Sequence, residues 1–352
     1  MVRDDQAPDP GRFPATRYQG SKRRLLPALA GIFARLEFGT ALDPMCGTGA
    51  VAYLLKTMGK AVTAADALAF NAAAARALVE NDGEIAGPLA GDLARGLPDP
   101  AAPPGLVETA YDGIFFEREE NRFIDQILPR INALPSPRRE LALWCLGQAC
   151  LRKRPYNLFH RANLAMRRRD VPRGFGNKAT WDTPFPAHLE RLAAAADRAV
   201  FAGARPCRAG RGDVLEADPA GFDLVYLDPP YVSGRGTGVD YLDFYHFLEG
   251  LAEPAGWEGR ILHRYRHKPL RGRGAGPWSH PARIAGAFEA AIERFAPAVL
   301  VISYRSDGIP SVSEIAGWLG RAGKRVEVVD IGRYTYALST NRRSREVVLV
   351  GR

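Results

Sequence analysis

The chain has 352 residues, of which 46% are hydrophobic and 25% are charged, as is usual for a globular protein. No apolar run is long enough to cross a bilayer, and the polar first dozen residues differ from a signal peptide, so we expect a cytoplasmic protein with no membrane partner. The formal net charge of +9 is compatible with a polyanionic partner such as nucleic acid.

The first third of the chain predicts one helix followed by a strand-helix-strand-helix unit. Residues 1–12 are expected to form a loose terminus. The predicted elements are a helix over 21–36 capped by Ser21, a strand over 40–43, a helix over 50–58, a strand over 61–66 and a helix over about 70–80. The sequence between the first strand and its helix is rich in glycine, which predicts a ligand-binding loop.

The middle of the chain changes character. Residues 84–113 are rich in Gly, Pro and Asp and predict an irregular connection. Three or four helices are predicted next, including 119–130, 137–151 and 187–201, without a convincing strand among them. We therefore expect a catalytic core over 13–113 and 202–352, interrupted by a helical insertion over 114–201.

The last third returns to alternating strands and helices, which predicts an α/β fold. The predicted strands cover 206–209 or slightly later, a segment ending at Asp228, and 298–303, 325–331 and 346–350; the predicted helices cover 241–251, 281–295 and 312–320. The last connection is short and carries no predicted helix, so the final strands are expected to be antiparallel.

The loop over 43–49, Asp-Pro-Met-Cys-Gly-Thr-Gly, predicts a nucleotide-type site. Gly47 and Gly49 allow close approach of the backbone to a ligand, and the following helix offers unpaired N–H groups. The loop is neither a GxGxxG motif nor a Walker loop, which disfavours dinucleotides and ATP and leaves S-adenosylmethionine.

Three other side chains are candidates for the same ligand. Asp66 ends the second strand, where it can accept hydrogen bonds from a ribose diol or simply cap the next helix. Asp213 ends another predicted strand and is a candidate for the adenine amine of a cofactor. Lys22 is a candidate for the cofactor carboxylate, with an exposed lysine as the alternative.

Asp228-Pro229-Pro230-Tyr231 ends an apolar strand abruptly, because two prolines cannot continue a sheet ladder. Asp228 and the Pro229 carbonyl would accept the two N–H bonds of an exocyclic amine, and Tyr231 would stack on its ring. Taken alone, the segment is equally compatible with a strand followed by a proline turn.

These motifs resemble the D12 class of adenine-specific DNA methyltransferases. Residues 18–22 are similar to that family's aromatic-x-Gly-x-Lys motif, 43–49 to its cofactor loop, Asp66 to its ribose acid and 228–231 to its catalytic signature. Tyr18 and Ser21 replace the tryptophan and glycine of the Dam branch. The cofactor set under this resemblance is Tyr18, Lys22, Asp43, Pro44, Cys46, Gly47, Gly49, Asp66, Asp213 and Asp228, and the catalytic set is Asp228, Pro229 and Tyr231.

The resemblance implies a Rossmann-like class I fold with a mostly parallel seven-stranded sheet, in which the inserted helical region recognises the target. It implies S-adenosylmethionine as cofactor and N6 of an adenine flipped out of double-stranded DNA as the acceptor. It also implies a nucleoid-associated location, and a cognate restriction endonuclease is a candidate partner. The cations expected to bind DNA are Arg152, Lys153, Arg154, Arg161, Arg167, Arg168, Arg169, Arg173 and Lys178, with a solvated helical face as the alternative.

Two other functions stay open. Related tetrapeptides occur in enzymes that methylate RNA, so adenine or guanine in ribosomal RNA is an alternative acceptor. A catalytically silent protein that binds nucleic acid on the same scaffold is another alternative, and calorimetry with S-adenosylmethionine discriminates it.

No metal site or disulfide is predicted. The cysteines are Cys46, Cys145, Cys150 and Cys207, which form no CxxC pair and are expected to be reduced thiols in or near the core. His263 and His267 are four residues apart, but the cations around them favour an exposed basic loop over a metal site.

Overall fold

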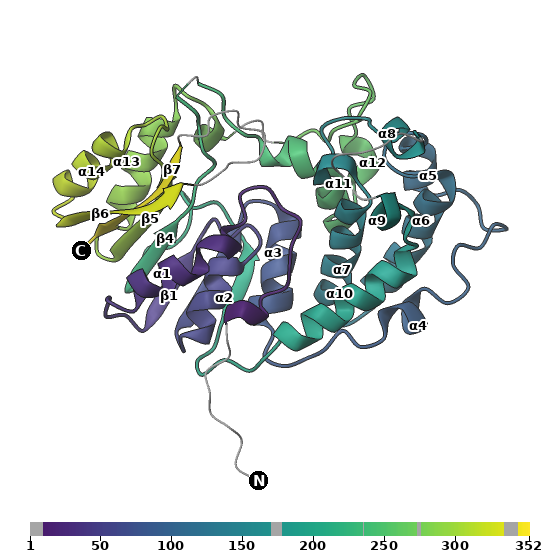
Figure 1. The fold of residues 1–352 in the computed structure, drawn as a ribbon, viewed down its shortest axis with the longest axis horizontal. Helices are drawn as coiled ribbons and strands as arrows, with labels where there is room; N and C mark the ends of the chain where they lie inside the picture. Colours follow the sequence, from purple (N-terminus) through teal and green to yellow (C-terminus); the bar gives the residue numbers. More distant parts are fainter. Residues whose placement is uncertain (1–9, 170–177, 235, 273–275, 334–343) are drawn as a thin grey trace, which may run out of the picture.

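The computed structural model describes residues 10–169, 178–234, 236–272, 276–333 and 344–352. Its centre is a seven-stranded sheet with the order β3-β2-β1-β4-β5-β7-β6 (Figure 1). The strands are β1 Thr40–Asp43, β2 Ala61–Asp66, β3 Arg208–Arg211, β4 Leu224–Leu227, β5 Val299–Arg305, β6 Val326–Arg333 and β7 Arg345–Gly351. Each lies close to a predicted strand, and the number of strands is confirmed.

The sheet is mixed, so the expectation of a mostly parallel sheet is wrong. The neighbouring pairs from β3 to β5 are parallel, whereas β7 lies between β5 and β6 and pairs antiparallel with both. The predicted antiparallel pairing of the last two strands is confirmed. The change from parallel to antiparallel pairing occurs at β7. This strand follows β6 through a short connection for which the sequence predicts no helix, and a strand that returns in this way can pair antiparallel with the strand before it.

Alternation along the strands divides the core into two layers. In β4, Leu224 and Tyr226 belong to one buried cluster, and Val225 and Leu227 belong to the other. Successive side chains of a strand point to opposite faces, so a strand that is apolar at every position is covered on both sides. Burial on both faces holds β4 in place, and Asp228 follows directly after its last residue.

The helices agree with the predicted pattern, with several short additions. They are α1 Leu26–Phe33, α2 Ala50–Thr57, α3 Ala69–Ala75, α4 Leu89–Leu93, α5 Leu106–Ala110, α6 Arg118–Asn132, α7 Arg138–Arg152, α8 Ala165–Arg168, α9 Lys178–Asp182, α10 Phe185–Ala199, α11 Tyr241–Ala252, α12 Trp257–Arg260, α13 Ile284–Arg294 and α14 Val312–Arg321. A 3₁₀ turn over Lys22–Leu25 precedes α1, and the Ser21 side chain accepts a hydrogen bond from the amide of Arg23, as predicted for a cap. None of the helices in the described part of the chain is long and apolar enough to span a membrane.

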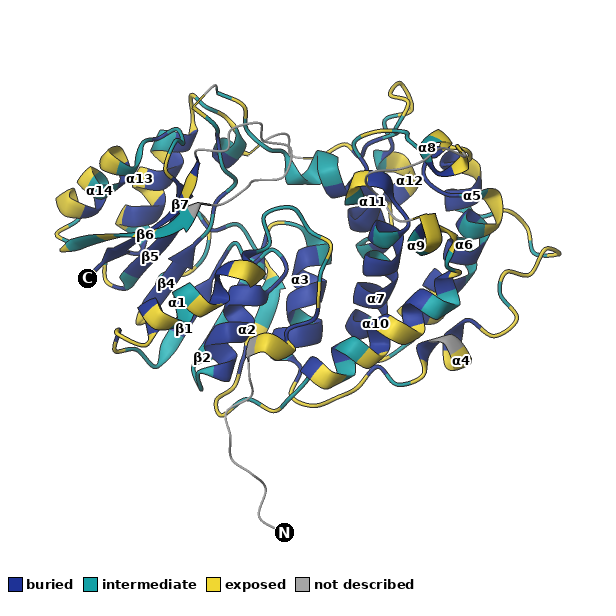
Figure 2. Cartoon of the chain, viewed as in Figure 1, coloured by how far each residue is buried: buried dark blue, intermediate teal, exposed yellow. Residues whose placement is uncertain are grey.

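The helices α5 to α10, which lie between β2 and β3 in the sequence, form a lobe beside the sheet together with α11 and α12, whereas α3 packs on β2 and β3 (Figure 1). Figure 2 shows that α7 is buried along most of its length, and it packs against α3, α10 and α11. The division into a core and a helical insertion over 114–201 stays a prediction. Residues 1–9 of the expected loose terminus lie outside the described residues, and Pro10–Arg12 form a 3₁₀ turn.

All four cysteines are buried free thiols, which confirms their prediction.

Candidate active site

A cavity of about 1650 Å³ opens at the carboxyl ends of β1 to β4. Because parallel strands end at the same edge of the sheet, the residues that follow them converge there. The predicted residues that line this cavity are Tyr18, Lys22, Asp43, Pro44, Cys46, Gly47, Asp66, Asp213, Asp228, Pro229 and Tyr231. Gly49 is not part of the lining, and it forms the N-cap of α2 instead.

The glycine loop takes a backbone shape that favours glycine at two positions. Gly47 and Gly49 have φ angles of 52° and 78°, in the left-handed region. A Cβ at Gly47 would lie 3.5 Å from the Tyr18 ring. The N-cap residue Gly49 has no side chain to cap the first turn of α2, and the Ala52 amide in that turn faces the Asp43 carboxyl.

Asp43, at the end of β1, is a buried carboxyl with unmet hydrogen-bonding capacity. It is 1% exposed, and neither carboxylate oxygen has a hydrogen-bond partner of good geometry among the described residues. Burial raises the pKa of Asp43 well above its ordinary value, and the charges of Asp228 and Asp66 raise it further. A buried polar group without partners is costly, so this carboxyl fits a site that a ligand completes.

Asp66 serves the loop as well as the cavity. Its Oδ2 accepts a hydrogen bond from the Gly47 amide, and its Oδ1 accepts one from the Leu68 amide, both at 2.9 Å. The Leu68 amide lies just before the first turn of α3, which no side chain caps, so Asp66 closes the link between β2 and α3 without acting as a helix cap. A carboxylate oxygen has two lone pairs, so each can also accept from a ligand hydroxyl. Asp213 likewise accepts a hydrogen bond from the Leu215 amide at 2.9 Å while lining the cavity.

Tyr18 forms part of an aromatic stack on the wall of the cavity. Its ring lies parallel to the rings of Tyr241 and Tyr245, with centroid distances of 5.6 and 4.7 Å. The Asn71 side chain donates a hydrogen bond to its hydroxyl at 3.1 Å. Tyr241 and Tyr245 come from α11, so the segment before α1 and the segment after the Asp-Pro-Pro-Tyr motif meet at this wall.

Asp228 lies in a charged cluster that includes a residue which the sequence did not single out. Lys22 Nζ is 2.7 Å from Asp228 Oδ1 and 3.6 Å from Glu346 Oε1. The Tyr231 hydroxyl donates to Glu346 Oε1 at 2.6 Å and contacts Asp228 Oδ1 at 3.1 Å. Glu346 belongs to β7 and is fully buried. The only sequence signal for it is an acid at the start of an otherwise apolar strand.

Two hydrogen-bond acceptors at the motif remain available to a ligand. The contacts of Asp228 with Lys22 and with Tyr231 both use Oδ1, and no hydrogen bond from the described residues to Oδ2 is observed. The Pro229 carbonyl also accepts no hydrogen bond from the part of the chain that the structure describes. These are the two acceptors that the sequence predicts for an exocyclic amine.

Burial raises the pKa of Asp228 to about 6; Lys22 opposes this rise and Glu346 reinforces it. The carboxylate is therefore the main form at neutral pH, and it is a better base than an exposed aspartate.

The Tyr231 ring is partly covered. The Lys22 ammonium lies over it at 4.7 Å from the centroid, and Tyr304 meets it edge-on at 5.1 Å. A base that stacks on Tyr231 therefore has to use the face that Lys22 leaves open. The predicted contact between Lys22 and a cofactor carboxylate stays a prediction, because in this structure Lys22 pairs with Asp228.

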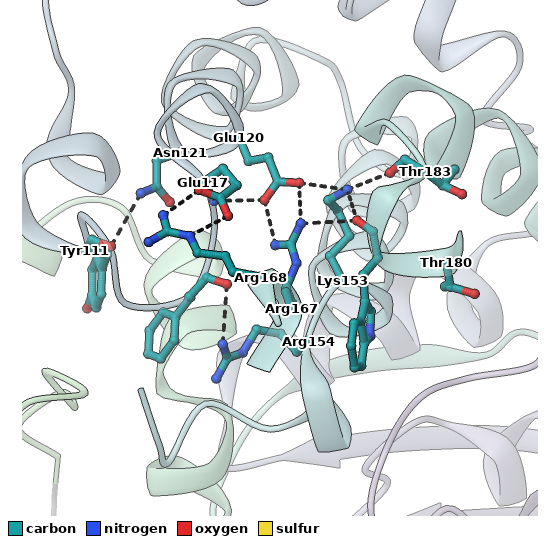
Figure 3. A network of polar contacts seen from close by, with 12 residues as sticks. Tyr111, Glu117, Glu120, Asn121, Lys153, Arg154, Arg167, Arg168, Thr180 and Thr183 are labelled. Carbon is teal, nitrogen blue, oxygen red and sulfur yellow. Dashed lines mark hydrogen bonds and ion pairs between the residues drawn. The ribbon is translucent and has the colours of Figure 1, made fainter. Parts of the chain in front are cut away.

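Three of the cations expected to bind DNA are buried inside the helical lobe (Figure 3). Lys153 is 1% exposed, and its Nζ donates to the carbonyl of Thr183 at 2.6 Å and pairs with Glu120 at 2.8 Å. Arg154 is also 1% exposed, and its guanidinium donates to the carbonyl of Arg161 at 2.7 Å.

Arg167 completes this buried set. It forms a two-point ion pair with Glu120 at 2.7 and 2.8 Å. Protein carbonyls and the Glu120 carboxylate enclose these three side chains in this structure, so they are not presented to solvent, and the prediction that they bind DNA stays a prediction. Their charge holds the lobe together.

The other predicted cations differ in how accessible they are. Arg168 is exposed but pairs with Glu117 at 2.6 Å, and Lys178 pairs with Asp182 at 2.7 Å. Arg152 is half-buried, and burial lowers its pKa. Arg161 and Arg169 are exposed, and Arg173 lies outside the described residues. A DNA contact by any of the exposed residues stays a prediction.

The family model described as D12 class N6 adenine-specific DNA methyltransferase matches residues 18–97. The matched segment contains the Tyr18 wall, the glycine loop and Asp66, and the Asp-Pro-Pro-Tyr motif lies beyond it. A comparison with curated proteins finds no match.

Proposed function

We propose that this protein transfers a methyl group from S-adenosylmethionine to N6 of an adenine within a specific sequence of double-stranded DNA. One observation carries the proposal: the glycine loop over 43–49 and the motif over 228–231 line one cavity at the carboxyl ends of adjacent strands. The family match over 18–97 supports the reaction class. The strand order is compatible with a class I methyltransferase fold.

The cofactor fits the donor set of this cavity. Neither carboxylate oxygen of Asp43 forms a hydrogen bond of good geometry with the described residues, although the amides of Met45 and Ala52 lie close enough to lower its pKa. The loop at Gly47 leaves room where a Cβ would approach Tyr18. Asp66 and Asp213 would hold the hydroxyl and amine groups of the nucleoside. When bound, the cofactor would supply an electrophilic methyl group on its sulfonium.

The residues of the motif would prepare the acceptor amine. The lone pair of adenine N6 is delocalised into the ring, so the amine is a weak nucleophile until its geometry changes. Asp228 Oδ2 and the Pro229 carbonyl would each accept one amine hydrogen and favour a pyramidal nitrogen. After transfer, the nitrogen carries a positive charge, and the carboxylate of Asp228 would receive the proton that it releases. The base would have to leave the duplex to reach this site, at a cost of a few kcal/mol.

The raised pKa of Asp228 predicts an acid limit on activity. Only the deprotonated carboxylate can take up the proton that the amine releases, so kcat/KM should rise with pH through a midpoint near 6. Glu346→Gln removes a negative charge that raises the pKa of Asp228, so it should move this midpoint to lower pH. Glu327→Gln, on the partly exposed face of β6, should leave the midpoint unchanged. If Glu346→Gln leaves the midpoint of kcat/KM unchanged, Glu346 does not influence the protonation of Asp228.

Binding of S-adenosylmethionine separates the proposal from a catalytically silent scaffold. Isothermal calorimetry should detect one site on the wild-type protein. Asp66→Ala removes the acceptors for the ribose and for the loop amides, and it should raise Kd at least tenfold. Asp218→Ala, an exposed residue before β4, is the control and should leave Kd unchanged. No detectable binding to the wild type would contradict the proposal.

Sequencing of host DNA by a single-molecule method, after expression of the chain, tests the acceptor itself. The expected result is N6-methyladenine in one sequence context. Modification confined to ribosomal RNA would favour the alternative acceptor.

A further inference from the structure

A second cationic surface lies beside the cavity, outside the helical region expected to read DNA. The hairpin over 261–270 follows α12, and Arg260, Arg271 and Gly272 at its base line the cavity. Figure 1 shows the loop after α12 projecting beyond the helical lobe, and Figure 2 shows it largely exposed. The surface therefore begins at the mouth of the candidate active site.

The hairpin is held firmly at its base. Ile261 and Leu270 form an antiparallel bridge, and the amide of Leu262 donates to the carbonyl of Pro269 at 2.9 Å. Lys268 Nζ donates to the carbonyl of Ala110, and His267 contacts Asp243 at 3.3 Å. Because the base is anchored to α11 and to the end of α5, the tip is presented in a defined position.

The tip carries cations that pair with no acidic side chain among the residues that the structure describes. His263, Arg264, Tyr265 and Arg266 are all exposed, and Tyr265 retains 43% of its accessible surface. Within the described residues, neither Arg264 nor Arg266 forms an ion pair, whereas the exposed Arg168 and Lys178 of the helical lobe do. The Arg264 guanidinium lies over the Tyr265 ring, 4.8 Å from the ring centroid. This contact lies within the hairpin, so the hairpin itself sets the direction of the guanidinium N–H groups.

A neighbouring loop adds to this surface. Phe159 donates its amide to the carbonyl of Phe244 at 2.8 Å, and the ring of His160 packs on Phe244 at 5.0 Å, so residues 155–161 lie against the start of α11. That loop carries the exposed Arg161 and the half-exposed Tyr156, which has a φ of 64°. A non-glycine residue held in this conformation often marks a functional position.

We propose that the hairpin over 261–270 is a DNA-binding element that contacts the duplex beside the flipped adenine. Arg264 and Arg266 bind backbone phosphates, and Tyr265 packs on the nucleotide that they position. Guanidinium groups and an aromatic ring on a cationic surface are the chemistry that a polyanion with stacked bases requires. This inference rests on the proposed function, because it assigns the hairpin to the substrate of that site.

Salt-dependent binding tests the hairpin without knowledge of the target sequence. Fluorescence anisotropy with a duplex of mixed sequence measures the slope of log K against log salt concentration. Arg264→Ala with Arg266→Ala should reduce the magnitude of that slope by about 1.8, since each phosphate contact contributes about 0.9. The same variant should bind S-adenosylmethionine as the wild type does, which shows that the cavity is intact.

A matched control removes two arginines at the other end of the sheet. Arg321 ends α14 and Arg325 precedes β6, and β6 runs parallel to β5, so both lie opposite the strand ends that line the cavity. Arg321→Ala with Arg325→Ala should leave the slope unchanged. An unchanged slope for the hairpin variant, or an equal change in the control, would overturn the assignment.

The outcomes separate this inference from the proposed function. If the wild type methylates DNA but the hairpin variant keeps the full slope, only the hairpin assignment fails. If the wild type prefers an RNA duplex of the same sequence, or binds neither duplex, both fail.

Discussion

Asp228→Asn is expected to lower kcat for methyl transfer by about 10²–10³-fold, while binding of S-adenosylmethionine persists. An asparagine side chain places an N–H group at one of the two oxygen positions, so it loses acceptor capacity where the amine needs it. The substitution also removes the base that receives the amine proton. The measurement is single-turnover transfer of a labelled methyl group to DNA, which separates chemistry from product release.

Asp218→Asn is the matched control for this experiment. It makes the same chemical change at an exposed position before β4, so turnover should stay at the wild-type value. Turnover near the wild-type value for Asp228→Asn, in a protein that still binds the cofactor, would show that the motif does not activate the amine.

Glu120→Gln is expected to lower the free energy of unfolding by about 3–5 kcal/mol, because it leaves two buried cations without their counter-charge. Lys153 and Arg167 are 1% and 7% exposed, and both pair with this carboxylate. Glutamine still accepts the hydrogen bond from the amide of Glu117 that forms the capping box of α6, so the loss reports the charge and not the cap. Urea denaturation measures it.

The pH dependence of that loss has a definite sign. Burial alone would raise the pKa of Glu120, but Arg167 and Lys153 outweigh it and hold the pKa below its ordinary value. A carboxyl whose pKa is lowered on folding contributes stability above its unfolded pKa of about 4.3, and this contribution disappears as the pH falls through the folded pKa. The difference between wild type and variant should therefore be largest near neutral pH and shrink in acid. Glu119→Gln, at the exposed neighbouring position, should have little effect at any pH.

The sequence predicts the elements of the fold well, because local patterns determine them. The apolar run of β4 and the prolines after it indicate both the strand and its end at Asp228. Gly47 and Gly49 indicate a loop because they adopt positive φ angles, which residues with a side chain rarely adopt. The cavity follows from the motif order once the strands are taken as parallel.

Pairings between distant residues could not be predicted in this way. Arg167 and Glu120 are 47 residues apart, so a cationic stretch that looks like a DNA surface in the sequence is neutralised from another helix. Glu346 is 115 residues from Tyr231, and only the position of β7 in the sheet brings the two together. A charge count along the chain contains neither fact.

The place of β7 has a consequence for the order in which the protein is made. It is the last strand in the chain, yet it lies between β5 and β6, and it carries the buried carboxylate that contacts Lys22 and Tyr231. A chain still on the ribosome can form the earlier parallel strands, but it cannot close the sheet until residues 345–351 have been synthesised. Nascent chains that lack residues 345–351 would therefore carry the glycine loop without Glu346 beside Lys22 and Tyr231, and the charged cluster around Asp228 would form only after translation of β7.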